Sequence, residues 1–171
     1  MLQEASEKMR KILREGTILT QTKLLSVIDF GANPSSFDSD DSELKELLEL
    51  ISKKVDLKKS ALSITLLISD MTKFLDINKV YKEYFAIRPP VRVCVACPRP
   101  SLESPRVLMG VTSLSSIGYP VKNLHVQSVS EWAPSNIGPY SQSNTINSHI
   151  LLAGQIGLNP GHMKLETNFK A

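Results

Sequence analysis

The chain has 171 residues and a net charge of +3, with 42% hydrophobic and 22% charged residues. This length accommodates one ordinary domain or one and a fraction, and the composition supports a buried core and excludes a wholly disordered chain. The lysines are spread out and do not form the basic stripe typical of nucleic-acid-binding proteins. The N-terminus lacks the apolar core of a signal peptide, and no apolar segment approaches the roughly 20 residues of a membrane helix. We therefore expect a cytoplasmic protein that binds neither nucleic acid nor membranes.

The first 41 residues give the weakest structural signals. Residues 2–15 have the apolar spacing of an amphipathic helix, and residues 17–30 contain enough apolar and β-branched side chains for one or two strands. Residues 31–41 are rich in Ser, Asp, Asn and Pro, which predicts a loop. We describe residues 1–41 as an N-terminal helix and loop without assigning them to a domain.

A second helix is predicted to start near residue 40. Asp40 to Glu43 has the spacing of a capping box and places acidic side chains at a helix N-terminus. The apolar residues that follow recur at the spacing of one helix face: Leu44, Leu47, Leu48 and Ile51.

The chain then alternates between strand and helix patterns up to residue 116. The segments are a strand, a helix and two strands, over residues 61–68, 71–85, 91–97 and 106–113. Ser69 or Asp70 is expected to cap the helix. We predict that the last two strands are adjacent and antiparallel, with both helices on one face of the sheet. This arrangement is an α+β fold.

The two cysteines, Cys94 and Cys97, have the spacing of a redox pair or of half a zinc site. However, they lie in a strand pattern, in which positions three apart point to opposite faces. No second Cys pair is present, and no His lies nearby in the sequence. We therefore predict two free thiols and no metal site.

The segment from residue 124 to 157 contains a Gly-Pro turn followed by Tyr140, Ser141 and Gln142. A short apolar strand then ends at Gly154, where a bare backbone segment is expected to come close to the Tyr and Ser side chains. Residues 158–171 carry apolar side chains with no following helix to cover them. We expect this last segment to be poorly ordered or loosely attached.

Three of these segments resemble motifs of one protein family, the RidA-type (YjgF) domains. Residues 137–142 and 154–157, IGPYSQ and GQIG, are similar to the opening of such a domain. Residues 70–85 are similar to the family's DM-x-x-F-x-x-(I/V)-N-x-x-Y-x-x-F helix, and residues 90–95 to its P-x-R-x-x-V strand. Residues 124–134 resemble the join between the two RidA-like domains of eukaryotic diphthine–ammonia ligases.

The resemblance implies a RidA-like (chorismate-mutase-like) antiparallel or mixed sheet with two helices on one face, plus the opening strands of a second such domain. The expected boundaries are residues 42–116 for the first domain, 117–123 for a linker, and 124–171 for a truncated start of the second. Because RidA-type proteins form trimers with pockets between subunits, the resemblance also implies a homo-trimer or pseudo-trimer.

The resemblance also implies a binding site. The family's strand arginine, which grips the substrate carboxylate, corresponds to Arg92, and strand alternation places Cys94 on the same face. Tyr140, Ser141 and the backbone at Gly154 are expected to complete the pocket.

This sequence departs from the family pattern at two positions. The family's acidic residue is absent from the last strand, residues 107–112, and its usual Ser before Gly-Gln is Ala153. Without that acid a general base is missing, so no catalytic residue is assigned.

Two functions are compatible with these features. The first is an assembly or ligand-binding module of a diphthine–ammonia ligase, a family that uses ATP and ammonium to amidate diphthine on elongation factor 2. The chain has no Gly-rich phosphate loop, so we expect no cofactor here. The second is a RidA-type enamine or imine deaminase. The family's older endoribonuclease label is disfavoured by the modest charge and the absence of paired catalytic histidines.

Overall fold

The computed structural model describes residues 17–21, 25–31, 39–99, 101, 104–115, 118–131 and 133–166. The helix predicted at residues 2–15 lies outside this range. One or two strands are expected within residues 17–30, and the structure has two, β1 (Thr17–Gln21) and β2 (Leu25–Gly31). They pair with each other, and β2 also pairs with β5, so the sheet of the first unit begins well before residue 42.

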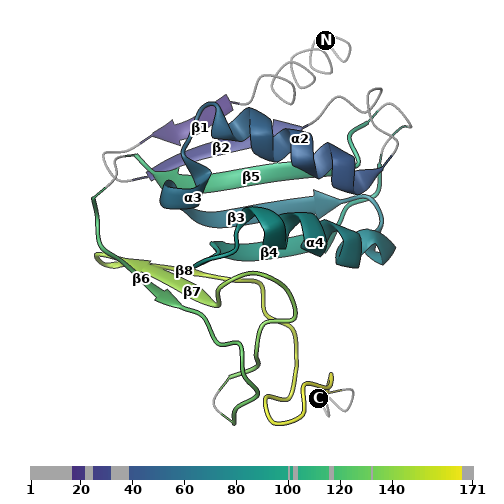
Figure 1. The fold of residues 1–171 in the computed structure, drawn as a ribbon, viewed down its shortest axis with the longest axis vertical. Helices are drawn as coiled ribbons and strands as arrows, with labels where there is room; N and C mark the ends of the chain where they lie inside the picture. Colours follow the sequence, from purple (N-terminus) through teal and green to yellow (C-terminus); the bar gives the residue numbers. More distant parts are fainter. Residues whose placement is uncertain are drawn as a thin grey trace.

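The first unit is a five-stranded sheet in the order β1-β2-β5-β3-β4, with its helices on one face (Figure 1). Its remaining elements are α2 (Asp40–Ser52), α3 (Leu57–Ser60), β3 (Ala61–Ile68), η2 (Met71–Lys73), α4 (Phe74–Tyr84), β4 (Val91–Ala96) and β5 (Val107–Leu114). The helices and strands predicted between residues 40 and 113 are therefore present, and Asp70 caps η2 by accepting a hydrogen bond from the Thr72 amide at 2.9 Å.

The predicted adjacency of the last two strands is wrong. In this sheet β4 pairs with β3, in parallel, and β5 pairs with β2 and β3, so β3 separates β4 from β5. The reason is that α4 runs back along the sheet and returns the chain to the end where β3 began, which makes β4 parallel to β3. The long connection after β4 then crosses β3, which a short hairpin could not do.

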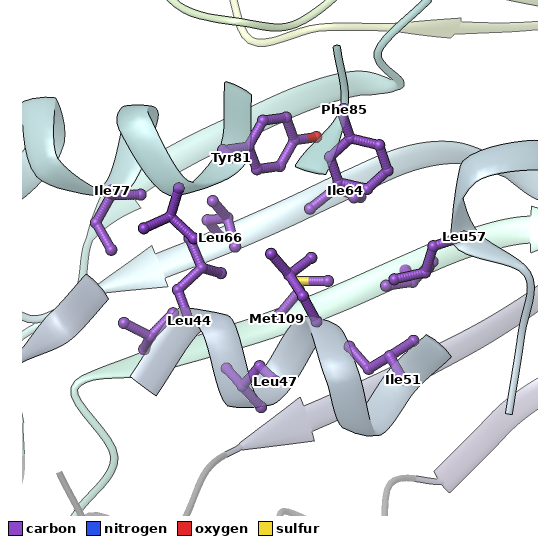
Figure 2. Packing of buried hydrophobic residues seen from close by; sticks show 14 of the residues in the cluster. Leu44, Leu47, Ile51, Leu57, Ile64, Leu66, Ile77, Tyr81, Phe85 and Met109 are labelled. Atoms are coloured by element: carbon purple, nitrogen blue, oxygen red, sulfur yellow. The ribbon is translucent and has the colours of Figure 1, made fainter. Parts of the chain in front are cut away.

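The core lies between the sheet and helices α2 and α4 (Figure 2). Strand β3 buries every second side chain, as alternation requires, and Ile64, Leu66 and Ile68 pack in the core beneath the helices. Helix α2 contributes the predicted apolar face. Tyr81 of α4 and Phe85, the residue that caps its C-terminus, close this core, with ring centroids 4.7 Å apart. Each fully buried Leu or Ile contributes about 1.5–3 kcal/mol of transfer free energy.

The start of α2 differs from the predicted capping box. The Ser39 N-cap makes no side-chain capping bond, and Glu43 is fully buried. The Glu43 carboxylate instead accepts hydrogen bonds from the amides of Arg106 and Val107, at 2.9 and 3.1 Å. Glu43 therefore fastens the helix to the start of β5. The sequence spacing alone cannot show whether the Glu43 side chain binds the N-terminus of its own helix or the start of β5.

A second, three-stranded sheet lies beside the β4 edge of the first (Figure 1). It consists of β6 (Val121–Leu124), β7 (Ser143–Ile146) and β8 (His149–Leu152), all antiparallel. Ser141 forms a parallel bridge with Val91, and the Gly154 amide donates to the Arg92 carbonyl at 3.1 Å. The segments that flank β7 and β8 therefore cover the open edge of β4.

Residues 158–166 fold back on themselves. Leu158 bridges Leu165, and the Glu166 amide donates to the Gly157 carbonyl at 2.8 Å. Ser135 contacts the Met163 sulfur at 3.4 Å. The rest of the C-terminal segment lies outside the described residues, so its predicted loose attachment stays a prediction. In the described part of the chain, no helix is long and apolar enough to cross a membrane, and no His, Cys, Asp and Glu cluster could hold a metal ion.

Candidate functional site

Arg92, the second residue of β4, is the centre of the site. Its side chain is only 3% exposed because β4 lies between β3 and the segment that carries Gly154. One terminal nitrogen, Nη2, donates to the Asn78 side-chain oxygen at 2.7 Å. The other, Nη1, is buried and has no hydrogen-bond partner within the described residues.

Three aromatic rings surround the guanidinium. Its central carbon lies 4.6 Å from the ring centroid of Tyr81, 5.2 Å from that of Tyr140 and 5.6 Å from that of Phe74. Such cation–π contacts stabilise a desolvated cation by up to about 2 kcal/mol each. Burial lowers the pKa of Arg92, but a guanidinium remains charged in proteins.

Gly138 lets the chain pass close to this cation. A Cβ atom at Gly138 would lie 2.6 Å from Arg92 Nη2 and 3.2 Å from the Asn78 side-chain oxygen. Any side chain here would therefore displace the Arg92–Asn78 pair. Glycine is therefore needed here so that the backbone can approach the Arg92 and Asn78 side chains closely, a common reason for a glycine near a ligand site.

A pocket of about 150 Å³ opens beside Arg92. We call it the Arg92 pocket, and it brings together four of the five predicted residues: Arg92, Cys94, Tyr140 and Gly154. Cys94 and Cys97 are both free, as predicted. Burial raises the pKa of the Cys94 thiol, which keeps it protonated near neutral pH and makes it a poor nucleophile.

Ser141, the fifth predicted residue, does not line this pocket. It is fully buried, and its hydroxyl donates to the Pro89 carbonyl at 2.5 Å. His125 Nδ1 lies 3.4 Å from the same hydroxyl. The hydroxyl therefore holds the Gly-Pro-Tyr turn against the segment that leads into β4, in a structural role.

Helix α4 supplies a part of the site that the sequence-based prediction did not include. Phe74, Asn78 and Tyr81 recur at i, i+4 and i+7, so they lie on one helix face that points at Arg92. That spacing was visible in the sequence, but only the packing of α4 on β4 directs it at the arginine. The Tyr81 hydroxyl is also buried without a partner in the described part, and burial raises the pKa of Tyr81.

The chemistry of the pocket suits binding. A guanidinium presents a planar, charged fork that matches a carboxylate. Among the described residues that line the Arg92 pocket there is no Asp, Glu or His to act as a general base. β5 also carries no acidic residue, in agreement with the sequence.

Two proteins that are similar to this chain in sequence have the same name, diphthine–ammonia ligase. Over 131 residues the chain is 39% identical to the diphthine–ammonia ligase of Schizosaccharomyces pombe, covering 76% of this chain and 21% of that protein. The Saccharomyces cerevisiae diphthine–ammonia ligase is 40% identical over 118 residues, 61% of this chain and 17% of that protein. Most of this chain is therefore homologous to a segment of diphthine–ammonia ligases. It spans only about a fifth of the length of these relatives, and no family model matches it.

The fold is RidA-like. A solved structure of an uncharacterised protein from Pseudomonas aeruginosa aligns with a TM-score of 0.50 and 20% identity, over 56% of this chain and 87% of that one. A YjgF-family protein from Neisseria meningitidis aligns over 60% of this chain and 92% of that one, with 19% identity and a TM-score of 0.47. A RutC family protein from Aquifex aeolicus is 47% identical over 38 residues, 22% of this chain and 30% of that protein.

Proposed function

We propose that this chain is a ligand-binding module of a diphthine–ammonia ligase, and that the Arg92 pocket binds a small carboxylate. One observation carries the proposal. Arg92 is buried and charged, yet its Nη1 has no hydrogen-bond partner within the described residues. A buried cation with an unsatisfied donor is costly, and a carboxylate ligand would remove that cost by accepting from the guanidinium.

The pocket supports binding without turnover. RidA-type deaminases need a group that activates water, and a missing general base lowers the rate by roughly 10²–10⁴-fold. No described residue in the pocket supplies that group. The deaminase is therefore the second candidate function, and it would require a base from another subunit or from the rest of the protein.

The relatives support a proposal for the role of this chain in a larger protein. We propose that the module serves an enzyme that amidates diphthine on elongation factor 2 with ATP, and that ATP binds elsewhere in that protein. We also propose that the module assembles as a homo-trimer or pseudo-trimer through its RidA-like units, and that it works in the cytoplasm. Light scattering of the purified chain tests the assembly.

Titration calorimetry with 2-oxobutyrate tests the binding function. We expect weak binding to the unmodified chain and a loss of about 1–3 kcal/mol in Arg92→Lys, because an ammonium lacks the bidentate geometry. Arg88→Lys is the matched control, since Arg88 is exposed and lies outside the pocket. Equal binding by both variants would remove Arg92 from the site.

A second assay separates the two functions. With 2-aminoacrylate generated in situ, the unmodified chain should show little or no turnover above the uncatalysed rate. Rapid deamination that is lost in Arg92→Ala would place the deaminase first.

A further inference from the structure

A second hollow lies next to the Arg92 pocket. This groove, of about 620 Å³, runs between α4 and the segment from residue 125 to residue 139. Leu75, Asn78 and Lys82 line it from the helix, and His125 and Ile137 line it from the segment. We call it the α4 groove. It is about four times the size of the Arg92 pocket.

Ile137 is the one described residue that lines both hollows. Its neighbour Gly138 lies against Arg92 and Asn78, and the Arg92–Asn78 hydrogen bond joins a wall of one hollow to a wall of the other. The partition between the two hollows therefore consists of the Ile137 side chain and this hydrogen-bonded pair.

The segment that carries Ile137 is fixed in place from its other side. The Gln142 side chain hydrogen-bonds the amide and carbonyl of Val126 and the carbonyl of Pro134, at 2.8, 2.9 and 3.2 Å. The Asn136 amide donates to the Val126 carbonyl at 3.1 Å. Because the backbone is held in this way, removal of the Ile137 side chain should open the partition without moving the segment.

We infer that Ile137 determines ligand size, by separating the Arg92 pocket from the α4 groove. This inference rests on the proposed carboxylate site. When Arg92 holds the carboxylate group, the rest of the ligand must fit into the Arg92 pocket. This pocket is small and mostly apolar, and Val93, Val95 and Ile156 line it. A 2-oxo acid with a short aliphatic chain fits there. A bulky side chain requires the volume beyond Ile137.

Calorimetry with two probes tests the inference. The unmodified chain should bind 2-oxobutyrate at least about tenfold more tightly than phenylpyruvate. Ile137→Ala should reduce this ratio by about tenfold or more, mainly through tighter phenylpyruvate binding. Ile137→Val should keep most of the discrimination. Ile137 is 46% exposed, so its truncation is not expected to unfold the chain, and circular dichroism checks this.

Leu75→Ala is the matched control. Leu75 lines the α4 groove alone and is 70% exposed, so its truncation should leave the ratio unchanged. If 2-oxobutyrate binds but Ile137→Ala does not change the ratio, the inference is overturned and the carboxylate site stands. If Leu75→Ala changes the ratio as much as Ile137→Ala does, the partition is not the cause. If no 2-oxo acid binds the unmodified chain, the carboxylate site itself fails.

Discussion

At the scale of single residues, a few neighbours determine the position and surroundings of the Arg92 guanidinium. Asn78 accepts a hydrogen bond from one nitrogen of Arg92, the rings of Tyr81 and Tyr140 lie 4.6 and 5.2 Å from its guanidinium carbon, and Gly138 leaves room for it. The sequence could identify Arg92, because the strand motif marks it. It could not show that Asn78 holds it, since a hydrogen bond across 14 positions depends on how a helix packs on a strand.

The closeness of Gly138 to Arg92 predicts a sharp effect of substitution. Gly138→Ala should weaken 2-oxobutyrate binding by about tenfold or more and destabilise the fold by about 1–3 kcal/mol, because the new Cβ displaces a buried, hydrogen-bonded cation. Calorimetry and urea denaturation measure the two effects. Gly161→Ala is the control, since its Cβ would meet only ordinary contact distances. Unchanged binding in Gly138→Ala would mean that the Arg92 geometry is not needed.

Glu43 predicts a pH dependence of stability. Burial raises the pKa of this carboxyl, against the opposing effect of the two amide hydrogen bonds. Ionisation of the Glu43 carboxyl is less favourable in the folded state, where the group is buried, than in the unfolded state, where water surrounds it. The free energy of unfolding should therefore fall as the pH rises from the ordinary Glu pKa, about 4.3, through the raised value.

Urea denaturation between pH 4 and pH 7 tests the role of Glu43. Glu43→Gln keeps the oxygen that accepts from β5 and should make the loss of stability over this range smaller. Burial also raises the pKa of Asp40, so part of the loss should remain. Glu49→Gln, an exposed position on the same helix, should leave the loss unchanged. An equal loss in Glu43→Gln and the unmodified chain would contradict the assignment.

At the scale of elements, a small number of polar contacts join the second sheet to the first. Asn144 of β7 is buried, and its side-chain amide donates to the Leu62 carbonyl of β3 at 2.7 Å. It also accepts from the Asn123 side chain of β6 at 2.7 Å. Leu62, Leu114 and Ile146 form a small apolar cluster beside it. The position of β6–β8 therefore depends on one buried amide as well as on apolar packing.

Asn144→Ala should loosen the second sheet without unfolding the first. It leaves the Leu62 carbonyl without this donor, which costs about 1–3 kcal/mol. Hydrogen exchange should show faster exchange in β7 and β8, while β3 amides change little. Ser148→Ala is a suitable comparison because Ser148 is exposed and lies in the β7–β8 turn. Equal protection of β7 in the unmodified and Asn144→Ala chains would contradict the role of Asn144.

At the scale of the whole molecule, the first unit and the segments that flank β7 and β8 line one pocket. β4 and α4 of the first unit supply Arg92 and Asn78, and the segment that precedes β7 supplies Tyr140. The segment after β8 adds the backbone at Gly154. The pocket should therefore require both the first unit and these segments.

Truncation tests this dependence. A chain that ends at residue 120 retains the five-stranded sheet but loses Tyr140 and the cover over the β4 edge. It should lose detectable 2-oxobutyrate binding, while circular dichroism confirms that the first sheet has folded. Binding that survives truncation would mean that the first unit carries the site alone.

The sequence by itself determined the local elements, the free thiols and the position of the arginine. Hydrophobic periodicity depends only on neighbours a few positions away, so it predicted α2, β3 and α4 close to their observed bounds. The tertiary structure alone decided that β3 lies between β4 and β5, that Glu43 binds β5, and that Asn78 and Gly138 face Arg92. These features join residues far apart in the chain, and packing and hydrogen bonding in three dimensions select among pairings that the local pattern leaves equivalent.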